Sequence, residues 1–285
     1  MTKIVFWGEC MLEQSTGRET RYGGDTLNSA LYLARASVNS DSNKAKPLSV
    51  YFATGIGTDS HSKHLLNQWK SEGVNTQLVA TINNKTVGTY RIKIDEHGER
   101  IFSYDRDDSA AKQYLQQSAC KIAKILTDND IDYIYFSGIS IALLSSLNSS
   151  RFFKQLVLFK AQGGRVIFDN NYREVLWQHC TKQFRLSCYQ QAMALADFAF
   201  LTDEDEYALY GGDSADAILA RYQQLGITGT TEIIIKQGNK PCIVQPKKEG
   251  EPWISVASQP ISPHKVIDTT AAGDAFSAGY LAKRL

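Results

Sequence analysis

Short apolar stretches alternate with amphipathic stretches along almost the whole chain, and this alternation limits the possible folds most strongly. The strand-like runs are KIVFWG, LSVYFATGIG, IDYIYFSG, RVIFDNN, DFAFLT and TEIIIKQG. Runs of helical period such as LNSALYLARAS, HSKHLLNQWKSEG, SRFFKQLVLFKAQ and DSADAILARYQQLG lie between them. This repetition predicts β-α-β units around a largely parallel sheet, with ligands at the carboxyl ends of its strands.

One segment departs from the alternation, because TVGTYRIKIDEHGERIFSYDRD has the pattern of two strands joined by a short loop at Gly98. If Asp95 pairs with Glu99, the register places Tyr90 opposite Tyr104, with Arg106 farther along the same face. Two phenols and a guanidinium would then lie together. An ordinary edge hairpin with aromatic cross-strand pairs would show the same pattern.

The bulk properties are those of an ordinary globular protein. A chain of 285 residues can form one large α/β unit or two small domains. Its net charge of +1 provides no field that would gather nucleic acid or an anionic membrane, and we expect neither as a partner. The five cysteines contain no CxxC pair and the amino terminus has no signal-peptide pattern, so we expect a reduced, cytoplasmic protein.

The stretch VIDTTAAGDAFSAGYLAKRL places one carboxylate, Asp274, directly after three small residues. A helical pattern follows them, and first-turn amides of a helix lack partners and favour an anion. We therefore interpret Ala271, Ala272 and Gly273 as a phosphate-binding turn. A carboxylate there would repel a phosphate unless it accepts a proton from an attacking hydroxyl, which makes Asp274 a candidate general base. A helix cap is the alternative, because Asp is a favoured capping residue.

The string DTTAAGDAFSAG resembles the C-terminal motif of the PfkB, or ribokinase-like, sugar kinases, whose usual form is DTTGAGDAF. The segments GECMLE, YGGDTLNSALYLAR, GIGTDSHSKHLLNQWKSEGVNT, FDNNYREVLW, LTDEDE and IKQGNKPCIV are similar to others of the family, in the family's order. The resemblance implies a single ribokinase-like three-layer α/β/α domain over residues 1–285. It also implies a small β lid formed by residues 9–24 and 86–106.

The resemblance implies the following site residues. ATP, with Mg²⁺, would contact Asn171, Lys236, Gly238, Ala271, Ala272 and Gly273, and the sugar would contact Gly24, Asn28, Tyr90, Tyr104, Arg106, Arg173 and Asp274. Asp203 and Glu206 stand where the family usually has NxxE and would act on the metal through water. Gly24 also fits a plain turn, and Arg173 an ion pair at a helix start.

Within the family, four features are similar to the 2-keto-3-deoxygluconate kinases. They are GECM, the YRxxIDxxGERxFxYxR hairpin, the DxNxR run at Asp169 to Arg173, and the alanine at position 271. This resemblance implies ATP-dependent phosphorylation of a sugar acid at its terminal hydroxyl. An arginine fork suits the carboxylate of such a substrate, which supports Arg106 and Arg173.

Two other functions remain open from the sequence. They are a kinase for a neutral sugar or nucleoside, such as a fructokinase or ribokinase, and a catalytically silent sugar-binding protein. The similar chains usually continue with helices that wall the adenine pocket, so we expect the C-terminal end of the fold to be missing here. The sequence is compatible with a homo-oligomer.

Overall fold

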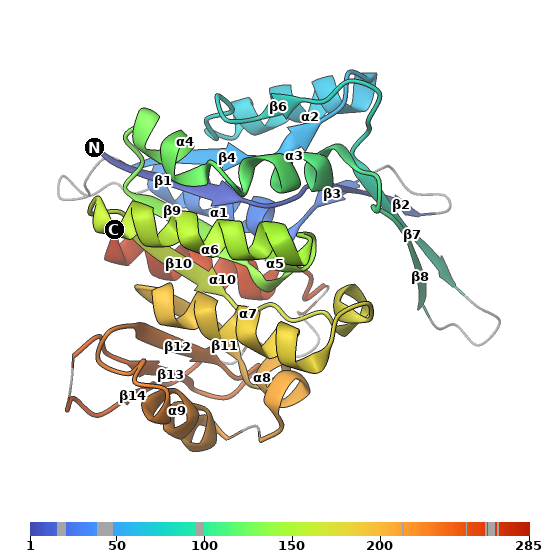
Figure 1. Cartoon of the computed structure of the whole chain (residues 1–285). Coiled ribbons are helices and arrows are strands. Elements are labelled where there is room, and N and C mark those ends of the chain that lie inside the picture. Colours follow the sequence, from blue (N-terminus) through green and yellow to red (C-terminus); the bar gives the residue numbers. More distant parts are fainter. Residues whose placement is uncertain are drawn as a thin grey trace.

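The computed structural model describes residues 1–15, 21–38, 48–94, 100–212, 214–248, 250–259, 261, 266 and 268–285. Within them the chain forms a large sheet covered by helices, with a smaller sheet at one end (Figure 1).

The large sheet has eight strands and is parallel over most of its width. In spatial order they are β14 (Ile254–Val256), β13 (Cys242–Gln245), β12 (Glu232–Lys236), β11 (Phe198–Thr202), β10 (Arg165–Asp169), β9 (Tyr133–Ser137), β1 (Thr2–Trp7) and β4 (Leu48–Ala53). The pairs from β12 to β4 are all parallel, whereas β13 and β14 are antiparallel additions at one edge. The carboxyl ends of the parallel strands therefore share one edge, as the alternation predicts.

The helices cover both faces of this sheet. They are α1 (Asp25–Val38), α2 (Ser60–Ser71), α3 (Ala110–Ser118), α4 (Ile122–Asp128), α5 (Gly138–Ala142), α6 (Ser146–Ala161), η1 (Glu174–Trp177), α7 (Lys182–Leu195), α8 (Asp203–Tyr210), α9 (Ala215–Gln224) and α10 (Ala272–Arg284). Figure 1 shows α5, α6 and α7 in front of the sheet and α1 and α10 behind it.

Two hydrophobic cores fill the space between the layers. Alternate side chains of β1 enter different cores: Val5 and Trp7 belong to the one under α3–α9, and Ile4 and Phe6 to the one under α1, α2 and α10. A strand buried on both faces must be apolar at consecutive positions, which is why KIVFWG has no polar alternation. The expected three-layer α/β/α fold is confirmed.

The segments expected to form the lid contribute a separate four-stranded sheet, which projects beyond the body (Figure 1). Its order is β3 (Arg21–Gly23), β2 (Met11–Ser15), β7 (Gly88–Ile94) and β8 (Arg100–Asp105). A further two-stranded sheet pairs β5 (Gly55–Ile56) with β6 (Ala80–Thr81).

The hairpin register agrees with its prediction over the described strands, where Tyr90 pairs with Tyr104 and Ile92 with Phe102. The expected loop from Asp95 to Glu99, with Gly98, lies outside the described residues. β8 is the edge strand of the lid sheet, so the hairpin is also the edge hairpin of the alternative interpretation.

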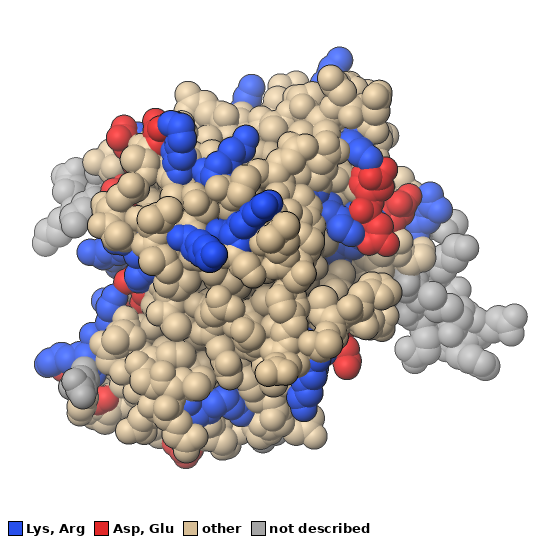
Figure 2. Space-filling view, viewed as in Figure 1, with Lys and Arg blue, Asp and Glu red and all other residues tan. Residues whose placement is uncertain are grey.

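The described surface carries both signs of charge on the face shown in Figure 2, in keeping with the net charge of +1. Of the helices in the described residues, none combines the length and apolar character needed to cross a bilayer.

Candidate active site

The small residues before Asp274 form the entry to α10. The helix spans Ala272–Arg284, and Ala271 precedes it in the left-handed conformation with φ of 60°. Glycine adopts this conformation without steric cost, whereas alanine is strained there by about 1 kcal/mol. The geometry therefore gives a physical reason for the glycine that the usual motif has at this place.

Asp274 lies in the first turn of α10 and faces the start of α1. Asn28 Nδ2 donates to its Oδ2 at 2.9 Å, and Ser29 Oγ lies 3.5 Å from its main-chain oxygen. Burial, and then the nearby charge of Asp25, raises the pKa of Asp274 to about 7, and Asp169 adds a smaller effect in the same direction. A carboxylate with a pKa near neutrality suits a general base that must accept a proton and release it.

The turn itself is partly hydrogen-bonded. The amide of Ala272 donates to Thr269 O at 3.1 Å. This hydrogen bond must break before the amide can donate to a bound anion. Among the described residues outside the backbone of α10, a Cβ atom at Gly273 would meet the Nζ atom of Lys236 alone within 4 Å, at 3.7 Å. A cation therefore lies beside the small residues at the helix start, and together they fit a polyphosphate.

Gly24 and Arg106 both lie at the root of the lid, next to Glu9. Gly24 has φ of 143°, and a Cβ atom there would lie 2.5 Å from Glu9 O, so only glycine allows this close approach. Arg106 Nη2 donates to Glu9 Oε1 in a buried ion pair, with side-chain exposures of 9% and 4%. Arg106, predicted as the cation for a substrate carboxylate, is thus already paired with a carboxylate of the protein.

The two predicted phenols lie side by side on the lid. The ring centroids of Tyr90 and Tyr104 are 6.2 Å apart, and the Arg106 guanidinium is 6.0 Å from the Tyr104 centroid. The Tyr90 hydroxyl donates to Glu13 at 2.6 Å, whereas the Tyr104 side chain is half exposed. The predicted grouping of two phenols and a guanidinium is present.

Arg173 and the acidic residues of α8 lie near one another. Arg173 Nη1 donates to Tyr172 O at 2.7 Å and pairs with Asp205 Oδ1 at 3.3 Å, and its side chain remains 52% exposed. The ion-pair alternative for Arg173 is therefore present in the structure, and exposure leaves the guanidinium accessible.

Glu206, predicted to act on the metal through water, has partners within the protein. It is fully buried: Tyr222 OH and Asn170 Nδ2 donate to Oε1 at 2.9 and 3.3 Å, and Arg221 Nη1 donates to Oε2 at 2.7 Å. Burial raises the pKa of Glu206 to about 7. Both oxygens of Glu206 are engaged within the protein, whereas Asp203, the other residue of the predicted pair, is partly exposed.

The other residues predicted for ATP occupy loops at the carboxyl edge of the sheet. Asn171 follows β10 with φ of 24°, and its Nδ2 donates to Asp25 Oδ2 at 2.6 Å. Gly238 follows β12 with φ of 59°. Both continue strands whose ends also carry Asp169 and Lys236, so the expected convergence at one sheet edge occurs.

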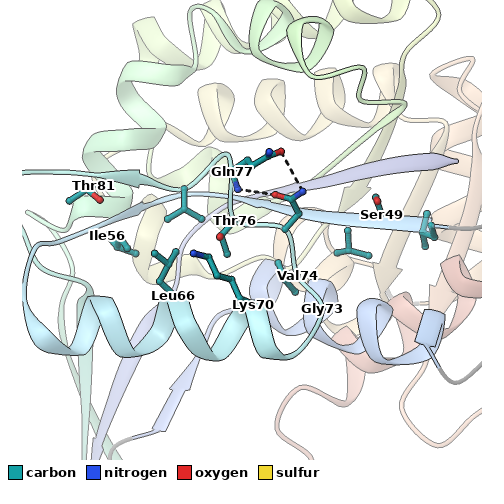
Figure 3. Close-up of a pocket in the computed structure, with 13 residues that line it drawn as sticks. Ser49, Ile56, Leu66, Lys70, Gly73, Val74, Thr76, Gln77 and Thr81 are labelled. Atoms are coloured by element: carbon teal, nitrogen blue, oxygen red, sulfur yellow. Dashed lines mark hydrogen bonds between the residues drawn. The ribbon is translucent and has the colours of Figure 1, made fainter.

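A cavity with a volume of about 630 Å³ lies elsewhere, between α2 and β4–β6 (Figure 3). Leu48, Ser49 and Val50 at the amino end of β4 line it, and Lys70 extends into it from α2 (Figure 3). None of the predicted site residues lines this cavity.

The whole of residues 1–285 matches the family model described as pfkB family carbohydrate kinase. The chain belongs to this family of carbohydrate kinases. Two curated relatives illustrate the range of similarity. The 2-dehydro-3-deoxygluconokinase of Dickeya dadantii is 42% identical over 286 residues, which cover 99% of this chain and 87% of the relative. A fructokinase of Klebsiella pneumoniae is 29% identical over 284 residues, covering 98% and 83%.

Solved structures show the same fold as this pfkB-family chain. A PfkB protein from Polaromonas sp. JS666 has a TM-score of 0.76 and 24% identity, with 100% of this chain and 90% of the other covered. An Escherichia coli protein provisionally assigned as ribokinase II, solved in complex with ATP and Mg²⁺, has a TM-score of 0.77 and 18% identity, with coverages of 100% and 86%.

Three carboxylates that lie next to the predicted site residues were given no role from the sequence. They are Glu9, just after β1, Asp25, in the first turn of α1, and Asp169, the last residue of β10. A usable signal was present for Glu9 and Asp169, because ligand sites of parallel sheets form at the carboxyl ends of strands.

Proposed function

We propose that this carbohydrate kinase transfers the terminal phosphoryl group of ATP to the terminal hydroxyl of 2-keto-3-deoxygluconate, giving 2-keto-3-deoxy-6-phosphogluconate. The observation that carries the proposed chemistry is Asp274, held by Asn28 in the first turn of α10 directly after the small residues. The 42% identity to a 2-dehydro-3-deoxygluconokinase over 99% of the chain supports the substrate.

Asp274 would accept the proton of the attacking hydroxyl. Its pKa of about 7 makes it a stronger base than an ordinary aspartate while leaving a large share ionised near neutrality. The hydrogen bond from Asn28 fixes one carboxylate oxygen, which leaves the other for the hydroxyl.

The start of α10 and Lys236 would hold the phosphates. Amides of Ala271, Ala272 and Gly273 would balance the charge that develops on the transferred group. Lys236 adds a fixed positive charge next to Gly273. Asn171 and Gly238 would contribute further contacts to ATP from the neighbouring strand ends.

A magnesium ion, when bound, would neutralise phosphate charge. Asp203 fits a water-mediated role because it is a partly exposed carboxylate at the start of α8. Glu206 would act indirectly, by holding Asn170 and Arg221.

The sugar acid would bind between the lid and the strand ends, contacting Gly24, Asn28, Tyr90 and Tyr104. Arg106 and Arg173 are the proposed cations for its carboxylate. Closure of the lid over the bound sugar would exclude water that competes for the phosphoryl group.

A kinase for a neutral sugar is the second candidate, and the Glu9–Arg106 ion pair favours it. A guanidinium that is already balanced by a buried carboxylate has less charge to offer a second one. The 29% identity to a fructokinase is consistent with this candidate.

A substrate panel tests the proposal. We expect phosphorylation of 2-keto-3-deoxygluconate with ATP and Mg²⁺ at a kcat/KM well above that for fructose, ribose or adenosine. We expect Asp274→Asn to lower kcat by roughly 10²- to 10⁴-fold while sugar binding is retained. A higher kcat/KM for a neutral sugar would favour the second candidate function. Wild-type turnover by Asp274→Asn would show that Asp274 is not the general base and would favour the helix-cap interpretation.

We also propose that residues 1–285 form a single catalytic unit, with residues 9–24 and 86–106 as its lid. We propose a cytoplasmic location for the protein. A homo-oligomer is compatible with this organisation and this location. Cell fractionation and sedimentation analysis would test the location and the oligomeric state.

A further inference from the structure

Asp169 is a buried carboxylate at the carboxyl end of β10, and its side chain faces inward. Only 4% of the residue is exposed. Tyr135 OH donates to its Oδ2 at 2.9 Å, Ser277 Oγ at 3.1 Å and Lys236 Nζ at 3.1 Å. Three donors on one oxygen satisfy the hydrogen-bonding capacity of this buried carboxylate.

These three donors come from three elements that build the candidate site. Tyr135 lies on β9, Lys236 ends β12, and Ser277 lies on α10. Ser277 follows Asp274 by three residues, so the two side chains share one face of the helix. Asp169 therefore contacts both the helix that carries the proposed base and the lysine beside the proposed phosphate site.

A second chain of contacts approaches Asp274 from α1. Ser29 Oγ lies 3.4 Å from Tyr135 OH, which itself donates to Asp169. Ser29 follows Asn28, which donates to the Asp274 carboxylate. The base is thus connected to Asp169 on both sides, through Ser277 along α10 and through Tyr135 and α1.

The charges of Asp169 and Lys236 compensate each other. The side chains are 6% and 11% exposed, and Ser277 Oγ is also 3.4 Å from Lys236 Nζ. An ion pair held in this way has little freedom to reorient, so it sets where the ammonium lies relative to the first turn of α10.

We propose that Asp169 is a positioning residue for phosphoryl transfer: it fixes the first turn of α10 and Lys236 relative to each other without contacting the substrate. The proposal rests on the proposed function, because it assigns the base to Asp274 and a phosphate contact to Lys236. Such alignment matters most in the transition state, where small displacements of a catalytic group are costly.

Asp169→Asn tests the proposal, because it keeps the shape and removes the charge. We expect kcat to fall by roughly 10- to 100-fold while the KM values for ATP and sugar change less than about three-fold. The pKa of Asp274 is raised by the charges of Asp25 on α1 and Asp169 on β10 and lowered by that of Lys236 on β12. Loss of the Asp169 charge lowers the pKa of Asp274, so the acid limb of the pH–kcat profile should move to lower pH.

Asp197→Asn is the matched control. Asp197 is likewise buried and accepts from two lysines, Lys160 at 2.7 Å and Lys247 at 2.6 Å, but it precedes β11 at the opposite end of the sheet. The control should lower the melting temperature and leave the acid limb unchanged. A purely structural role for Asp169 would appear as equal losses in both variants with an unmoved acid limb, which would overturn the proposal.

If Asp169→Asn does not fold, Ser277→Ala removes the contact to α10 and keeps the ion pair. We expect a smaller fall in kcat, again with little change in KM, and an unchanged kcat would contradict the proposal. These comparisons use whichever substrate the wild-type protein phosphorylates best. Absence of sugar-acid activity would therefore contradict the proposed substrate and still leave Asp169 tested.

Discussion

At the scale of single residues, the candidate site depends on charges that are balanced within the protein. Arg106 pairs with Glu9, Lys236 with Asp169, and Arg221 with Glu206. A buried charge without such a partner would cost several kcal/mol. A negatively charged group of the substrate must therefore compete with the carboxylate that already pairs with each of these cations. Whether a cation binds the substrate depends on that pairing as well as on its residue type.

Arg106→Ala tests whether this guanidinium recognises a sugar carboxylate. If it does, kcat/KM for the sugar acid should fall by about 2–3 kcal/mol in free energy, the contribution of a charge-assisted bond, and a neutral deoxy sugar should be affected less. Arg106→Lys should give an intermediate loss, because it keeps the charge and loses the planar fork.

The control for this pair of variants is Arg35→Ala, which removes an exposed ion pair with Glu72 away from the lid. It should leave both substrates unaffected. Equal losses for acid and neutral sugars in the Arg106 variants would make Arg106 a structural residue of the lid root, and the carboxylate contact would then depend on Arg173.

At the scale of elements, the entry to α10 combines an open approach with a fixed helix start. Ala271 takes the left-handed conformation, and in the described part of the chain outside the backbone of α10, Lys236 Nζ alone would contact a Cβ atom added at Gly273. Because the space in front of Gly273 is open, a side chain at this position would cause little strain in the folded protein. The same side chain would, however, occupy the space that a bound phosphate needs.

Gly273→Val should therefore separate activity from stability. A branched side chain would occupy the space beside Lys236, so we expect turnover with ATP to fall by roughly 10²-fold or more. Valine has a slightly better helix propensity than glycine, by less than about 1 kcal/mol, so the melting temperature should change by only a few degrees. Activity assays and thermal melts would measure the two effects.

Gly279→Val is the control, because it makes the same change in the same helix where an added Cβ atom meets nothing within 4 Å. It should match Gly273→Val in stability and the wild type in turnover. Wild-type turnover by Gly273→Val would contradict the phosphate-binding role of this turn.

At the scale of the whole molecule, the candidate site lowers the free energy of unfolding of the fold that forms it. The two cores and the packing of α1 against α10 hold Asp274 where burial and the charges of Asp25 and Asp169 raise its pKa to about 7 from an ordinary 3.8. The folded state binds the proton more tightly than the unfolded state, so this group costs stability as pH rises from about 4 to 7.

Asp274→Asn should therefore stabilise the protein at alkaline pH. The gain is absent below about pH 4, grows through the window up to pH 7, and is expected to reach about 1–3 kcal/mol at pH 8, after allowance for partial exposure of the site. Chemical denaturation at pH 5 and pH 8 would measure it. A gain that is the same at both pH values, or a loss at pH 8, would contradict a raised pKa for Asp274.

The sequence by itself determined the layered α/β fold, the lid hairpin and the turn before Asp274. These depend on local or periodic patterns: apolar runs for strands buried on both faces, alternation about Gly98, and small residues at a helix start. Each is a relation between residues close in the chain, so it can be recognised without knowing what packs against it.

Only the tertiary structure decided which partners the charged groups have. Glu9 and Arg106 are 97 residues apart and Lys236 and Asp169 are 67 apart, and no local pattern pairs them. Their pairing follows from strand order, which places the ends of β10 and β12 on either side of β11 and brings Glu9, after β1, to the base of the lid. Burial and charge compensation arise from that packing, and they decide which cations remain available to a substrate.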